Sequence, residues 1–168
     1  MTVDAAPREQ TYDVPTSAWV LAWASVVMQL TALAERGAAN GEAALISVPL
    51  SALVVAWFSA GVIRARMVRT WLAGIVLLLV TIGSVVDLVT GPPLLDLVGT
   101  AAAVAAFAAF VSYVRSDCFA ALRADRDASP SGLGGLVAVA ILVGALGGLI
   151  APLDGPDQGP GVHLRIGL

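Results

Sequence analysis

The chain has 168 residues, of which 58% are hydrophobic and only 12% are charged, and its formal net charge is −3. Soluble domains carry about 25% charged residues, so this composition excludes an ordinary soluble domain and indicates an integral membrane protein whose main contact is the lipid bilayer. The negative charge and the lack of a clustered basic face exclude nucleic acid as a partner.

Cysteine and histidine are too rare for most cofactor chemistry. Cys118 is the single cysteine, which excludes an intramolecular disulfide and a CxxC site, and His163 is the single histidine, which disfavours a haem-binding bundle. We therefore expect no cofactor and no metal. All nine basic residues are arginine, which together with the abundance of Ala, Val and Gly indicates a high-GC bacterial genome. The predicted location is the bacterial cytoplasmic (plasma) membrane.

Five apolar segments approach the length of about 20 residues that a membrane-spanning helix needs. The predicted spans are 17–34, 44–63, 70–90, 94–114 and 133–151. The predicted fold is thus an all-α bundle of five transmembrane helices over 17–151. The segments 1–16 and 152–168 are predicted to be a cytoplasmic N-terminal tail and an extracytoplasmic C-terminal tail, both too short to form a domain.

The first span, 17–34, leaves one alternative open. It ends in the triplet Ala32-Leu33-Ala34, which is typical of a signal-peptidase site, and cleavage there would leave four spans. The preceding tail carries Asp4, Glu9 and Asp13, whereas a signal peptide begins with a basic segment. The span also contains Gln29 near its middle, and we expect this amide to hydrogen-bond to a neighbouring helix.

Arginines alternate between the connecting loops, which predicts the orientation because positive charge stays on the cytoplasmic side. Two loops carry six of them, and we interpret these as a cytoplasmic membrane-surface anchor: Arg64, Arg66, Arg69, Arg115, Arg123 and Arg126. With Arg8, seven arginines lie on one side, and only Arg36 and Arg165 lie on the other. The N-terminus is therefore predicted to be inside and the C-terminus outside.

The stretch "VVDLVTGPPLLDLVGT", residues 85–100, places two aspartates at an outer hairpin whose turn is Gly91-Pro92-Pro93. Asp96 opens the fourth span, where the helix dipole favours an anion, so it needs no special role. Asp87 closes the third span, where the dipole disfavours an anion. We predict that Asp87 pairs with Arg36 in a structural role, and the alternative is proton or ion coupling.

The loop that follows the fourth span is predicted to continue it as a helix. Phe119 and Leu122 are three residues apart, so they share a face that we expect to lie on the membrane surface, and docking of a cytoplasmic partner is the alternative. Cys118 is interpreted as an inert thiol, unless Arg115 lowers its pKa and makes it reactive.

Small residues recur every four positions in the last span, at Ala140, Gly144 and Gly148. Such a stripe lets another helix approach closely, because helix association in lipid depends on packing. The partner helix belongs either to the same chain or to a second copy, and we favour the first.

The chain contains no phosphate-binding loop, no HExxH and no GxSxG, so we expect no enzymatic activity. We predict a small polytopic membrane protein that acts as a non-enzymatic accessory or interaction subunit of a membrane assembly, with other membrane subunits or copies of itself as partners. The alternative is a small oligomeric transporter or channel. The polar side chains within its spans are few, so its solute would be apolar or weakly polar: Gln29, Ser25, Ser51, Thr81 and Ser84.

Overall fold

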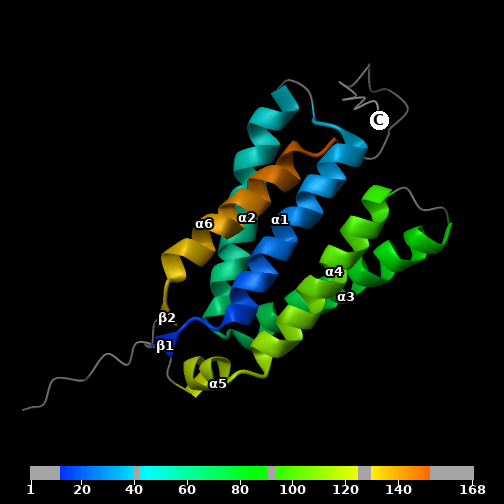
Figure 1. Cartoon of the computed structure of the whole chain (residues 1–168). Helices are drawn as coiled ribbons and strands as arrows, with labels where there is room; N and C mark the ends of the chain where they lie inside the picture. The colour runs from blue at the N-terminus through cyan, green and yellow to red at the C-terminus, as the bar shows by residue number, and fades with distance from the viewer. Residues whose placement is uncertain (1–11, 40–41, 91–93, 125–129, 152–168) are drawn as a thin grey trace, which may run out of the picture.

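The computed structural model describes residues 12–39, 42–90, 94–124 and 130–151, and within these ranges the protein is helical apart from one short strand pair, one isolated bridge and the connecting segments (Figure 1). The elements are β1 (Tyr12–Asp13), α1 (Thr16–Arg36), α2 (Glu42–Ile63), α3 (Met67–Thr90), α4 (Leu94–Val114), α5 (Asp117–Ala124), β2 (Pro130–Ser131) and α6 (Leu133–Leu149). The predicted all-helical fold is confirmed. The tails 1–11 and 152–168 and the turn 91–93 lie outside the described residues.

Four helices, α1 to α4, are long and apolar enough to cross a membrane, which indicates a membrane protein. The helix that matches the fifth predicted span, α6, has 17 residues and is shorter than the others. It ends at Leu149, two residues before the predicted end. Ile150 is extended and pairs with Ala38 in an antiparallel bridge, and the Ala151 N–H donates to the Gly37 carbonyl at 3.1 Å. A tertiary contact thus ends this helix.

The five long helices run alternately in opposite directions through one bundle (Figure 1). α1 lies at its centre and packs against both α4 and α6, while α6 packs most extensively on α2 and α3 packs mainly on α4. α2 and α3 follow each other in the chain but contact each other only lightly. From one side of the bundle to the other, the helices therefore lie in the order α2, α6, α1, α4 and α3.

The two ends of the bundle differ in charge. We call the end that carries α5, β1 and β2 the α5 end, and the end where α1 and α3 finish and α4 begins the opposite end (Figure 1). Of the six arginines in the described ranges, five belong to the α5 end: Arg64, Arg66, Arg69, Arg115 and Arg123. Arg36 belongs to the opposite end. Arg8, Arg126 and Arg165 lie outside the described residues.

α5 is a separate helix, so the prediction that α4 continues through this segment is wrong. The Ser116 hydroxyl accepts a hydrogen bond from the Phe119 N–H at 3.2 Å, which caps a new helix at its third residue. Phe119 and Leu122 do share a face, but both side chains are buried in the bundle core. The Phe119 ring meets Tyr113 edge-on, with the centroids 5.5 Å apart. Their predicted position on the membrane surface is therefore also wrong.

The small-residue stripe of α6 lies against the backbone of α2. A Cβ atom added at Gly144 would lie 2.6 Å from Ala52 Cα, and one added at Gly148 would lie 2.6 Å from Val48 Cα. Ala140, the third member of the stripe, is buried. The Ser47 hydroxyl, on α2, donates to the Gly148 carbonyl at 2.7 Å. Within this chain the stripe thus provides the close approach of two helices.

Candidate functional site

A polar cavity of about 310 Å³ opens at the opposite end of the bundle, among α1, α3 and α4. It is the place where the three polar candidates of the sequence, Gln29, Arg36 and Asp87, come together. The polar side chains that line it are Gln29, Thr31, Glu35, Arg36, Ser84, Asp87, Asp96 and Thr100. The consecutive helices α3 and α4 and the distant helix α1 therefore supply one site.

Glu35 and Asp96 form the centre of this site, and the sequence reasoning did not select either of them. Their carboxyl groups lie close enough to interact across the α1–α4 interface. Two carboxyl groups at close range repel each other when both are ionised. Arg36 attracts the Glu35 carboxylate and Asp87 repels it. Glu35 could have been predicted as a member of the site. Spans that alternate in direction bring the end of the first span to the same end of the bundle as Asp87 and Asp96.

The neighbouring hydroxyl groups are held by backbone carbonyls, and this fixes the walls of the cavity. Thr31 is buried and its hydroxyl donates to the Met28 carbonyl at 2.9 Å. A Cβ atom added at Gly99 would lie 3.2 Å from Thr31 Oγ1, so the glycine lets α4 approach α1. The Thr100 hydroxyl donates to the Ser84 carbonyl at 3.0 Å and joins α4 to α3.

Asp87 lies in the last turn of α3 and Arg36 in the last turn of α1, and both line the polar cavity. Their direct pairing stays a prediction. In the described part of the chain, no group of three or more His, Cys, Asp or Glu side chains is arranged to hold a metal ion. The site can therefore offer hydrogen bonds and a mixed charge pattern, with carboxyl groups in excess.

Gln29 also contacts the other half of the bundle. Its Oε1 atom would lie 3.4 Å from a Cβ atom added at Gly147, and the same Cβ atom would lie 3.7 Å from Ser51 Oγ. The Gln29 amide is thus placed where α1, α2 and α6 meet, next to a glycine that leaves room for it. The predicted hydrogen bond from this amide to a neighbouring helix stays a prediction.

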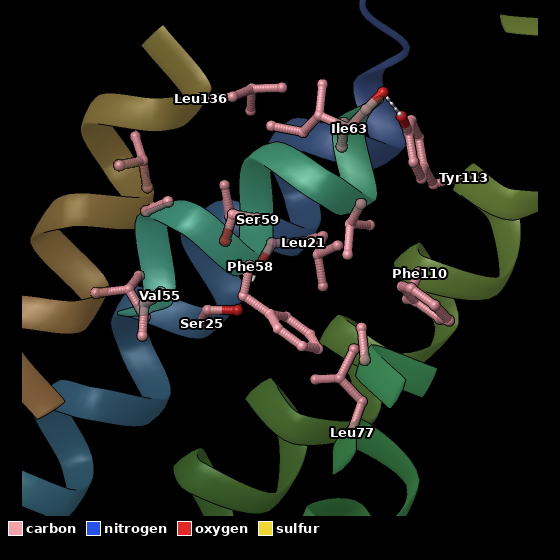
Figure 2. A pocket seen from close by; sticks show the side chains of 17 residues that line it. Leu21, Ser25, Val55, Phe58, Ser59, Ile63, Leu77, Phe110, Tyr113 and Leu136 are labelled. Atoms are coloured by element: carbon pink, nitrogen blue, oxygen red, sulfur yellow. Dashed lines mark hydrogen bonds between the residues drawn. The ribbon is translucent and has the colours of Figure 1, made fainter. Parts of the chain in front are cut away.

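A second cavity of about 170 Å³ lies inside the bundle and is lined by all five long helices (Figure 2). Its walls are mostly apolar, with Phe58, Leu77 and Phe110 pointing toward its interior (Figure 2). The hydroxyl of Ser25 donates to the Leu21 carbonyl at 2.8 Å. Tyr113 donates to the Ile63 carbonyl at 3.1 Å, shown as a dashed line in Figure 2. Because these hydroxyl groups are bound to backbone carbonyls, the cavity suits an apolar molecule.

The predicted anchor arginines differ in their surroundings. The Arg69 guanidinium lies over the Trp57 ring at 3.6 Å and donates to the Trp57 carbonyl at 3.1 Å. Arg123 donates to Met67 Sδ at 3.9 Å. The other three of the described set are exposed: Arg64, Arg66 and Arg115. Arg69 therefore joins α3 to α2, a role that its position in a basic loop did not reveal.

Burial raises the pKa of the Cys118 thiol. This direction is opposite to the one that would activate the thiol, because a higher pKa leaves less thiolate at neutral pH. The structure thus favours the inert interpretation of Cys118 over the reactive one.

Comparison with protein-family models, with curated proteins and with solved structures finds no match for this chain.

Proposed function

We propose that this protein is a non-enzymatic membrane protein that acts by association, as an accessory or interaction subunit of a larger membrane assembly. The observation that supports this proposal is the exposure of α3. In its most apolar 18-residue window 0% of the residues are buried, whereas the corresponding share in α4 is 33%. α3 packs on α4 along one side, and the rest of its apolar surface is open to lipid or to the helix of another protein.

The topology that goes with this proposal has five crossings, with the N-terminus inside and the C-terminus outside a bacterial cytoplasmic membrane. Its support is the alternating helix direction and the concentration of arginine at the α5 end. At 1.5 Å per residue, the 17 residues of α6 extend over about 26 Å, close to a hydrocarbon core of about 30 Å. The central position of α1 between α4 and α6 favours retention of the first span over its cleavage.

Site-specific photo-crosslinking in native membranes tests the association. A photoreactive residue at Leu79, which is 62% exposed on α3, is compared with one at Leu142, which is 43% exposed on α6. We expect one discrete protein adduct from Leu79 and mainly lipid adducts from Leu142. Mass spectrometry then identifies the adduct, and co-purification in a mild detergent measures its stoichiometry. The proposal is refuted if both positions label lipid alone.

The cavity of about 170 Å³ that all five long helices line supports a second candidate function, an oligomeric transporter or channel for an apolar or weakly polar solute. This candidate predicts crosslinks from Leu79 to a second copy of the same chain. It also predicts that Ala73→Phe, which fills the cavity from α3, abolishes uptake of a fluorescent apolar solute into vesicles that contain the protein. Uptake that is unaffected by Ala73→Phe would argue against it.

A further inference from the structure

A third cavity, of about 440 Å³, lies on the side of the bundle at the α5 end, between α3, α4 and α5. We call it the α3–α5 groove. Its walls are aromatic and aliphatic side chains from three helices, including Trp71, Ile75, Leu78, Phe107, Val114 and Phe119. Trp71 is 66% exposed at this surface, as is typical of an indole at the boundary between hydrocarbon and headgroups. The groove is thus an apolar surface next to a tryptophan of the kind found at the membrane interface.

Two polar side chains line the α3–α5 groove, and only one of them is available to a ligand. Thr70 is buried and its hydroxyl donates to the Arg66 carbonyl at 3.1 Å. Arg123 is the one ionisable group among the described lining residues. Among the described residues its hydrogen-bond partner is Met67 Sδ, at 3.9 Å, and this contact uses one of the five guanidinium N–H donors. The groove is therefore apolar along its length and cationic at one place.

The helix that carries this cation is held in position. Leu122 and Phe119 anchor α5 in the core, and the Ser116 cap fixes where the helix starts. Arg123 lies in its last turn. An arginine on a fixed helix at the end of an apolar groove matches a molecule with a phosphate next to a hydrocarbon chain, because guanidinium binds phosphate by charge-assisted hydrogen bonds.

We propose that the α3–α5 groove binds an anionic phospholipid from the leaflet that meets the α5 end, with one acyl chain along α3 and α4 and the phosphate on Arg123. The charge of this end supports an anion: five described arginines lie there, against the carboxylates of Asp13 and Asp117. This inference does not depend on the function proposed above, because the groove is formed by α3, α4 and α5 of this chain whether or not another protein covers the rest of α3.

The test measures lipid binding to the purified full-length protein by native mass spectrometry. The probes are phosphatidylglycerol and phosphatidylcholine with identical acyl chains. We expect one phosphatidylglycerol to be retained at least tenfold more tightly than phosphatidylcholine, since a charge-assisted contact distinguishes them. Arg123→Gln should remove most of this preference. Arg64→Gln removes the same charge from the same end without touching the groove, and it should leave the preference unchanged.

A second pair of variants tests the acyl-chain part of the groove. Ile75 lines it and Ile82 does not, and the two residues are similarly exposed on α3, at 49% and 52%. Ile75→Trp should lower retention of both lipids, whereas Ile82→Trp should not. Equal retention of the two lipids by the unchanged protein would overturn the proposal. An equal loss with Arg64→Gln and Arg123→Gln, or no difference between the two tryptophan variants, would also overturn it.

Discussion

Substitution of Gly144 by alanine tests whether the α6 stripe holds this chain together. The added Cβ atom would lie 2.6 Å from Ala52 Cα and 2.7 Å from the Ser51 carbonyl oxygen. Carbon atoms in contact prefer separations of about 3.5–4.0 Å, so α6 and α2 must separate by about 1 Å at this point. Both atoms belong to the backbone, so no rotation of a side chain can relieve the overlap.

The expected loss follows from this geometry. Overpacking in a filled interface costs about 1–3 kcal/mol, and the better helix propensity of alanine offsets up to about 1 kcal/mol of it. A net loss of about 1–2 kcal/mol lowers the melting temperature of a chain of this size by about 2–8 °C. The assay is thermal unfolding of the purified protein in a mild detergent, with size-exclusion chromatography to record the oligomeric state.

Gly83→Ala is the matched control, because a Cβ atom added at Gly83, on α3, meets nothing within 4 Å. This variant should melt at the same temperature as the unchanged protein or slightly above it. The reasoning is refuted if Gly144→Ala and Gly83→Ala melt together. If Gly144→Ala instead dissociates an oligomer and leaves the melting temperature unchanged, the stripe joins two copies of the chain.

Three further predictions concern single contacts. Because burial raises the pKa of Cys118, its alkylation at pH 7.5 should be slower than that of the SDS-denatured protein and should increase as the pH rises above 9; equal rates in both states would contradict this. Tyr113→Phe removes the hydrogen bond to the Ile63 carbonyl and should cost about 1 kcal/mol, measured as a melting temperature lower by about 2–4 °C. Glu35→Gln replaces one of two neighbouring carboxyl groups by a neutral amide that can donate to Asp96, so the melting temperature at pH 7.5 should be unchanged or higher. Arg36→Gln should lower the melting temperature, because it removes a charge that stabilises the carboxyl groups by up to about 1 kcal/mol. If Glu35→Gln melted below Arg36→Gln, the inference that carboxyl groups are in excess at this site would be refuted.

The positions of the long helices could be predicted closely from the sequence, because a run of apolar residues in lipid can satisfy its backbone only as a helix. The predicted span 94–114 matches α4, and 44–63 differs from α2 by two residues. The predicted start of the third span, at residue 70, is three residues late, because a boundary drawn from hydropathy excludes the charged Arg69. In the structure this arginine belongs to α3 and lies over Trp57.

The candidate site was only partly predictable. Gln29, Arg36 and Asp87 are visible because a polar group in or next to an apolar span stands out. The proximity of Glu35 to Asp96 could not be predicted, since it requires that α1 packs on α4, two helices that are not consecutive in the chain.

What the sequence by itself determined is the set of long helices and the charge of the two ends, because both depend on composition along short stretches. The tertiary structure decided the rest: which helix α1 contacts, which way the apolar face of α5 turns, and where α6 ends. These outcomes depend on shape between distant segments, such as the glycines that let α6 lie against α2 and the strand-like bridge between Ala38 and Ile150. Hydropathy carries no information about such contacts, since lipid and helix interior are equally apolar.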